Sequence, residues 1–255
     1  EKELTSHGII PIHVSEGVGQ NLQDHLDYII SFKSKRRDTV GITPIGLWDM
    51  ARAGLRWRKE GVGLFASPMA EGGGFFKTSP EQSRPDVQLH FVVGIVDDHM
   101  RKIHFSHGFS CHVCQLRPES RGHVGLNSSD PSDAPRIDPN FLSAPEDLNV
   151  LKQGARLVEQ IVHAEALAPW RSKRLYPNDG SDAALEADIR ARADTIYHPV
   201  GTCRMGSDAD AVCDLQGKVI GMKGLRVVDA SLMPRLISGN TNAPTIMMAE
   251  KISAE

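Results

Sequence analysis

The chain has 255 residues, of which 40% are hydrophobic and 24% charged, a profile that fits one large or two smaller globular domains. A net charge of −3 gives no electrostatic basis for binding nucleic acid, and 5% aromatic residues are too few for a base-stacking surface. No apolar run reaches the roughly 18 residues of a membrane span. Four cysteines do not make a disulfide scaffold at this length. The expected location is therefore the cytoplasm, and a peripheral position at the inner face of a bacterial membrane stays open.

The first third of the chain contains short extended segments and one helix. The pattern predicts a strand at residues 9–14, a polar glycine-rich turn at 17–25 and a second strand at 26–32. Between residues 44 and 57, apolar side chains recur at helical spacing, which predicts a helix.

Three strand candidates then follow one another, at residues 85–93, 108–118 and 122–127. Strands in succession without intervening helices favour an antiparallel sheet. Cys111 and Cys114 form a C-x-x-C motif inside the second candidate. Residues three apart on a strand point to opposite faces, so we expect no shared metal and no metal site in the chain.

The last hundred residues add helices to the expected sheet. A capping box at 143–146 begins a long helix, and a second helix is expected at 182–193. A short apolar strand is expected at 224–230, followed by a helix at 245–251, and strand–loop–helix is half of an α/β dinucleotide fold. The predicted class is therefore α+β: an antiparallel-sheet domain with flanking helices, plus the C-terminal strand–helix part of an α/β domain.

Two short runs contain the chemically interesting side chains. His198 precedes two residues that shape the backbone, Pro199 and Gly201, and on its own it is best interpreted as a structural loop histidine. Asn240 and Asn242 precede an apolar helical segment. They can act as helix caps, or the partly positive helix N-terminus that they flank can face an anionic ligand.

Five segments together resemble one enzyme family. Residues 197–206, 224–234 and 239–246 resemble the C-terminal signature of the glucose–methanol–choline (GMC) flavoprotein oxidoreductases, and residues 17–25 and 135–142 resemble two further blocks. The matches run in family order over essentially the whole chain. Within the family, the closest resemblance is to choline dehydrogenase-like and alkanol dehydrogenase-like members from bacteria.

The resemblance implies FAD as cofactor and the oxidation of an alcohol to a carbonyl by hydride transfer to flavin N5. His198 matches the catalytic base, and Asn240 matches the residue that hydrogen-bonds the alkoxide, a role less well suited to Asn242. Asp229 and Ala230 match residues near the FAD phosphate and ribityl chain.

Further family positions concern the flavin ring and the substrate. Thr241, Asn242 and Pro244 match the turn against the pyrimidine edge of the isoalloxazine. Glu71 matches a glutamate that choline-oxidising relatives place against the substrate ammonium, and a carboxylate suits a quaternary amine. The substrate stays open between choline, which would give betaine aldehyde, and aliphatic primary alcohols, which we favour slightly.

The resemblance also implies a domain plan. Residues 1–28 and 195–255 would belong to the FAD domain, and residues 29–194 would form the substrate domain. The family's N-terminal G-x-G-x-x-G motif has no counterpart here, so we expect a C-terminal fragment that binds FAD weakly or not at all alone. The expected partners are the N-terminal half, a small alcohol and an electron acceptor such as a quinone. An inactive fragment or binding module is the alternative.

Overall fold

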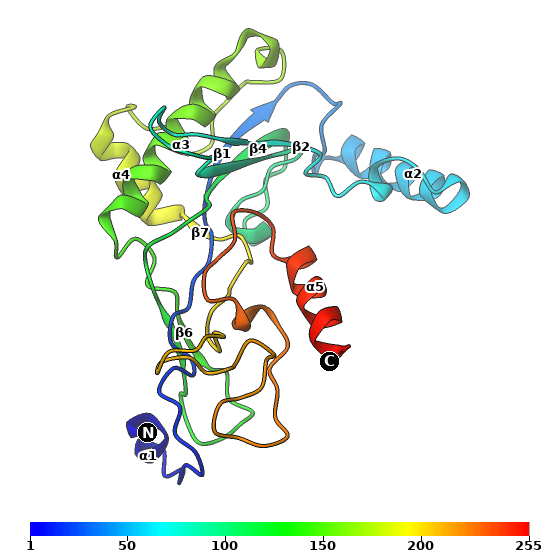
Figure 1. The fold of residues 1–255 in the computed structure, drawn as a ribbon. Helices are drawn as coiled ribbons and strands as arrows, with labels where there is room; N and C mark the ends of the chain where they lie inside the picture. Colours follow the sequence, from blue (N-terminus) through cyan, green and yellow to red (C-terminus); the bar gives the residue numbers. More distant parts are fainter. Residues whose placement is uncertain (255) are drawn as a thin grey trace. The chain divides into compact units, whose positions relative to one another are not determined.

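The computed structural model describes residues 1–254, which divide into two compact units, each assembled from segments far apart in the sequence (Figure 1). Unit 1 contains Glu1–Leu26, Leu116–Asp147 and Thr195–Glu255. Unit 2 contains Asp27–Gln115 and Leu148–Asp194. None of the helices in residues 1–254 is both long and apolar enough to cross a lipid bilayer.

A five-stranded sheet organises unit 2, with the strand order β2-β3-β4-β1-β7. Antiparallel pairs join β2 to β3, β3 to β4 and β4 to β1. The strands are β1 (Leu26–Ser34), β2 (Gly72–Phe76), β3 (Val87–Val92), β4 (His107–Gln115) and β7 (Asp194–Thr195). The strands predicted at residues 26–32, 85–93 and 108–118 and the antiparallel sheet are confirmed.

One face of this sheet is apolar and packs against α3 (Pro145–His163). Phe109 stacks between two neighbours on this face, with ring centroids 5.7 Å from Phe32 and 5.3 Å from Phe91. The helix backbone comes close to the sheet at Gly154, where a Cβ atom would lie 2.8 Å from Cγ2 of Val113. Any larger residue would therefore push α3 away from the sheet.

The opposite face of the sheet has buried polar side chains. The register places His90 of β3 directly opposite His112 of β4, so the two imidazoles share a face. His112 Nδ1 lies 2.7 Å from a carboxylate oxygen of Asp27 on β1. Ser31 and Ser110 are hydrogen-bonded on the same face, at 2.8 Å. The two faces follow from the period-two alternation of a strand.

Two more helices belong to unit 2, and both begin with a side-chain cap. In α2 (Pro44–Glu60), Thr43 Oγ1 accepts a hydrogen bond from the Gly46 amide at 3.0 Å. In α4 (Asp182–Arg192), Ser181 caps the Ala184 amide at 3.2 Å. Capping residues of this kind satisfy the free amide groups of a helix start. The helices predicted at 44–57 and 182–193 are therefore confirmed. The short 3₁₀ turns of this unit are Leu64–Ala66, Asp98–Met100 and Glu165–Leu167.

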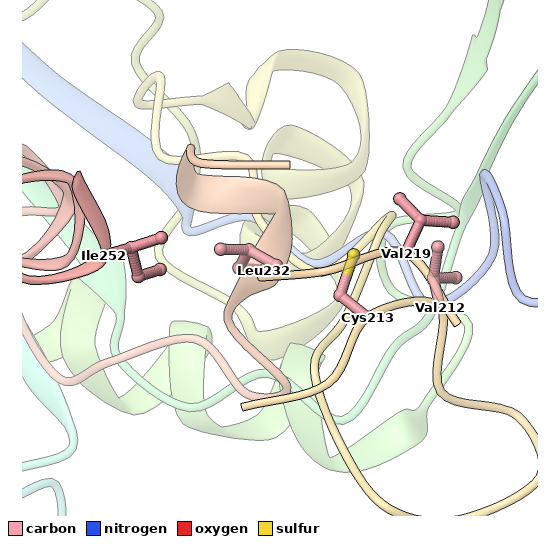
Figure 2. Packing of buried hydrophobic residues seen from close by; sticks show 5 residues of the cluster. All are labelled: Val212, Cys213, Val219, Leu232 and Ile252. Atoms are coloured by element: carbon pink, nitrogen blue, oxygen red, sulfur yellow. The ribbon is translucent and has the colours of Figure 1, made fainter. Parts of the chain in front are cut away.

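Unit 1 is mostly irregular chain around small apolar clusters. Its regular elements are α1 (Lys2–Ser6), the antiparallel pair β5 (His123–Gly125) and β6 (Arg136–Asp138), the 3₁₀ turn Ala230–Leu232 and α5 (Asn242–Ser253). In Figure 2, Leu232 lies between Ile252 of α5 and Cys213, with Val212 and Val219 completing the buried cluster. A second cluster joins Val200, Met233 and Leu236. These clusters anchor α5 and the segment that leads to it.

Three local predictions were wrong. Residues 9–14 form no strand, and Ile10 and Ile12 are 90% and 99% exposed. Residues 224–230 make only an isolated bridge between Arg226 and Lys218, because an extended segment becomes a strand only beside a partner strand. The last helix begins at Asn242 rather than at 245, since Pro244 fits within a first helical turn.

Candidate active site

His198 and Asn240 come together in unit 1. The side-chain amide nitrogen of Asn240 lies 3.3 Å from Nε2 of His198. His198 is only 8% exposed, whereas Asn240 is exposed. The imidazole is therefore buried with its Nε2 edge towards a side chain that solvent reaches. A base and a hydrogen-bond donor for a developing oxyanion need this arrangement.

The backbone around His198 is held in a specific conformation. The amides of Gln23 and Val200 exchange hydrogen bonds with each other's carbonyls, at 3.0 and 2.9 Å, in an antiparallel bridge. Gly201 follows with φ +98°, and a Cβ atom there would lie 2.5 Å from the Asn21 carbonyl oxygen. Only glycine can adopt this backbone without strain. The backbone conformation of this loop therefore requires the glycine found at position 201 of the motif.

Polar side chains of residues 21–25 connect the His198 loop with the segment that leads to Asn240. The side-chain amide of Asn21 donates to the carbonyls of Gly201 and Pro234, at 3.2 and 3.4 Å. Gln23 donates to the same Pro234 carbonyl and accepts from the Leu236 amide, both at 3.2 Å. Residues 21–25 are thus a scaffold that holds the His198 loop and the segment leading to Asn240 in register.

Asp24 supports the His198 loop through its backbone. One carboxylate oxygen accepts a hydrogen bond from the His198 amide at 2.9 Å, and the other accepts from the Thr195 hydroxyl. The Thr195 hydroxyl oxygen in turn accepts from the Tyr197 amide at 2.8 Å. Tyr197 has φ +67°, which a tyrosine adopts only when its surroundings fix it.

His25 is fully buried directly behind His198. The two Nδ1 atoms are 2.9 Å apart, and the rings are nearly perpendicular at 88°. Nε2 of His25 lies 3.0 Å from the Ile237 carbonyl oxygen and 3.2 Å from that of Leu116. Residues 17–25 were predicted to form a polar glycine-rich turn, and Gln23, Asp24 and His25 were not among the predicted site residues.

The residues expected near the flavin lie in the same unit. Asp229 is exposed, and one of its oxygens accepts from the amide and hydroxyl of Ser231, at 2.8 and 2.5 Å. Ala230 packs against the Val200, Met233 and Leu236 cluster.

Thr241, Asn242 and Pro244 lie at the start of α5. Thr241 is the N-cap residue and is buried, but its side chain makes no capping hydrogen bond to the helix. Asn242 is exposed and begins the helix, and Pro244 is half-buried in the first turn. The positive end of the helix dipole is therefore not satisfied by a side-chain cap.

Glu71 belongs to unit 2, whereas His198 and Asn240 belong to unit 1. It is exposed and immediately precedes β2. The C-x-x-C cysteines are also in unit 2, on β4, where Cys111 is paired with Ile30 and Cys114 with Asp27.

A family model described as GMC oxidoreductase matches residues 118–249, which is just over half of the chain. An alcohol dehydrogenase [acceptor] from Pseudomonas putida is 46% identical over 254 residues, covering 97% of this chain and 45% of that protein. An oxygen-dependent choline dehydrogenase from Cronobacter sakazakii is 40% identical over 255 residues, covering 98% of this chain and 45% of that protein. The chain thus spans a little under half the length of these relatives.

A solved structure gives the same relationship in three dimensions. A formate oxidase from Aspergillus oryzae, studied for its FAD modification, is 26% identical, with a TM-score of 0.88. The similarity covers 99% of this chain and 49% of that one. Family model, relatives and fold all agree: the chain belongs to the glucose–methanol–choline (GMC) oxidoreductase family.

Proposed function

We propose that this chain is the catalytic half of an FAD-dependent alcohol dehydrogenase that oxidises a primary alcohol to an aldehyde. The observation that carries the proposal is the 3.3 Å contact between His198 Nε2 and the Asn240 amide nitrogen. The relatives named as alcohol and choline dehydrogenases support it. So does the scaffold of residues 21–25, which fixes both segments of the pair.

His198 acts as the general base in this proposal. Its Nε2 removes the hydroxyl proton of the alcohol, which develops an alkoxide at the oxygen. The Asn240 amide donates a hydrogen bond to that oxygen as its negative charge grows. His198 is only 8% exposed, and low solvent exposure strengthens both interactions.

When bound, FAD supplies the hydride acceptor for the alcohol carbon. The residues that would hold it in this chain are Asp229, Ala230, Thr241, Asn242 and Pro244. The start of α5 fits an electron-rich ring edge, because the Thr241 side chain does not cap its amides and the helix dipole favours negative charge there. Ser231 orients the exposed Asp229 carboxylate for a polar ligand.

The domain plan is part of the proposal. We assign residues 1–28 and 195–255 to the FAD domain and residues 29–194 to the substrate domain. The adenine-binding part of the cofactor site would come from the N-terminal half that the longer relatives possess. The chain alone is then expected to bind FAD weakly or not at all, and stoichiometric flavin absorbance in the purified chain would contradict this.

The proposed substrate is an aliphatic primary alcohol, and choline is the second candidate. The higher identity to the alcohol dehydrogenase, 46% against 40%, favours the first. The exposed carboxylate of Glu71 favours the second, since it could pair with a quaternary ammonium group. Glu71→Gln should lower kcat/KM for choline and leave that for 1-butanol unchanged if Glu71 contacts the ammonium.

A complementation experiment tests the function as a whole. The chain is produced together with the N-terminal FAD-binding half, and alcohol-dependent reduction of a quinone or dye is measured. Activity that disappears in His198→Ala and persists in His13→Ala supports the proposal; His13 is an exposed histidine of the same unit. A flavin-loaded complex that reduces no acceptor with any alcohol favours the alternative, a binding module without chemistry.

A further inference from the structure

We propose that His25 is a positioning residue that fixes the tautomer of His198, so that His198 Nδ1 carries the proton and Nε2 is the free base. The tautomer rests on hydrogen-bond geometry alone. Its consequence for catalysis rests on the proposed function, in which His198 Nε2 takes the alcohol proton.

The contacts of His25 Nε2 fix the protonation of that ring. Two backbone carbonyl oxygens lie within hydrogen-bond distance of this nitrogen, that of Ile237 at 3.0 Å and that of Leu116 at 3.2 Å. A carbonyl oxygen can only accept a hydrogen bond, so Nε2 of His25 must carry the hydrogen. A neutral imidazole has one N–H group, and Nδ1 of His25 is therefore an acceptor.

The second step moves from His25 to His198. Their Nδ1 atoms are 2.9 Å apart, a distance that requires one hydrogen between them. Because Nδ1 of His25 accepts, Nδ1 of His198 donates. Nε2 of His198 then has the lone pair, and the Asn240 amide nitrogen, 3.3 Å away, is a donor that matches it. The contacts on both sides of His198 therefore agree on one tautomer.

The register of the chain explains why the two rings meet. The antiparallel bridge between Gln23 and Val200 places His25, two residues after Gln23, opposite His198, two residues before Val200. The Ile196 amide donates to the His25 carbonyl at 3.2 Å and continues the pairing. His25 is 0% exposed, so its ring is shielded from bulk solvent. The scaffold thus orients the imidazole of His198 as well as its backbone.

The His25–His198 pair resembles the base histidine and its orienting partner in a catalytic triad, but the orienting residue is a different type. In serine hydrolases a buried carboxylate accepts from the base histidine and holds its tautomer. Here a neutral imidazole has that place, and the carboxylate of Asp24 accepts from the His198 backbone amide instead. Asp24 thus holds the His198 backbone, and in the proposal the neutral His25 ring holds the His198 imidazole.

The tautomer can be observed directly in the full chain by long-range ¹H–¹⁵N NMR of ring-labelled histidine. We expect His198 to carry its proton on Nδ1 and His25 on Nε2. The opposite pattern, with His25 protonated on Nδ1 or His198 on Nε2, would overturn the inference. This measurement needs neither cofactor nor turnover, and it uses the unmodified protein apart from the His198→Ala variant that assigns the signals.

Two substitutions test the role of His25 in the flavin-loaded complex. His25→Phe removes the acceptor, so His198 should shift towards the Nε2–H tautomer and kcat/KM should fall about 10- to 100-fold, as for other orienting partners. His25→Gln offers an amide oxygen to Nδ1 and an amide N–H to the carbonyls, and should restore the tautomer and most of the activity. A His25→Phe enzyme with unchanged tautomer and rate contradicts the proposal.

A matched control separates orientation from loss of a buried ring. His107 is another buried histidine, 8% exposed, and it belongs to unit 2. Its Nδ1 lies 2.7 Å from the Thr39 carbonyl oxygen, and its Nε2 lies 3.2 Å from the Thr43 hydroxyl oxygen. His107→Asn should leave the His198 tautomer unchanged. If His198→Ala kept full activity, the proposed function would fail while the NMR result stood. If only His198→Ala were inactive and His25→Phe normal, the positioning role alone would fail.

Discussion

The carboxylate of Asp24 accepts a hydrogen bond from the backbone amide of His198 at 2.9 Å, across 174 positions of sequence. Asp24 is only 7% exposed, so the bond lies away from bulk water. A buried hydrogen bond to a charged acceptor is stronger than a neutral one, and its loss leaves a buried amide without an acceptor. This contact therefore connects the first segment of unit 1 to the His198 loop.

Replacing Asp24 by alanine should weaken the fold and displace the loop. We expect Asp24→Ala to lower the free energy of unfolding by about 2–3 kcal/mol, measured in urea. Asp24→Asn keeps an acceptor oxygen and should cost less. Asp49→Ala, an exposed aspartate on α2, is the control. Equal stability of Asp24→Ala and Asp49→Ala would show that the contact contributes little.

Gly201→Ala tests the backbone conformation of the same loop by adding a Cβ atom. The positive φ of +98° and the 2.5 Å approach to the Asn21 carbonyl oxygen both exclude a Cβ atom. We expect a loss of about 1–3 kcal/mol in the free energy of unfolding from backbone strain alone. Gly180→Ala has a positive φ without a close neighbour and should cost less. The opposite order of the two would contradict the described packing at Gly201.

The apolar face of the sheet should respond to a cavity in α3. Leu151 is fully buried, and Leu151→Ala should lower the free energy of unfolding by about 2–5 kcal/mol. Gln160→Ala changes an exposed position of the same helix and is the control for helix propensity. A Leu151→Ala variant as stable as Gln160→Ala would mean that α3 does not pack on the sheet.

Burial raises the pKa of the Cys111 thiol to about 12, and the nearby Asp27 carboxylate adds to the effect. Since the folded pKa lies above the ordinary value of 9.0, this thiol contributes stability that is complete below pH 9 and is lost as the pH rises towards 12. Cys111→Ala should therefore flatten the decline in melting temperature above pH 9. At pH 8, Cys111 should react with a thiol reagent more slowly than the half-buried Cys203. Equal reaction rates would contradict this burial.

Local pattern predicted the regular elements of this protein well. Alternation along β1, β3 and β4 reflects an apolar face under α3, so each strand could be predicted from its own residues. The strand prediction for residues 224–230 was wrong because apolar residues of this segment are buried against loops and do not pair with a neighbouring strand. Hydrophobicity alone does not distinguish these two environments.

The His198–Asn240 pair was predictable from the sequence, but the side chains that support it were not. His198 and Asn240 were identified from motifs that lie within short runs, and they do come together. The roles of Gln23, Asp24 and His25 depend on contacts with residues 91 to 213 positions away, which no local pattern encodes. A polar cluster next to a buried leucine, Leu22, was the one local sign that these side chains face inward.

Anaerobic flavin bleaching in the reconstituted complex tests the central claim most directly. A primary alcohol is mixed with the oxidised complex, and the loss of flavin absorbance is followed in the wild type and in His198→Ala. The account predicts bleaching in the wild type that is about 10²- to 10⁴-fold slower in the variant, the usual contribution of a general base, with flavin content unchanged. Bleaching at the same rate in both proteins would contradict the role of His198 as the base.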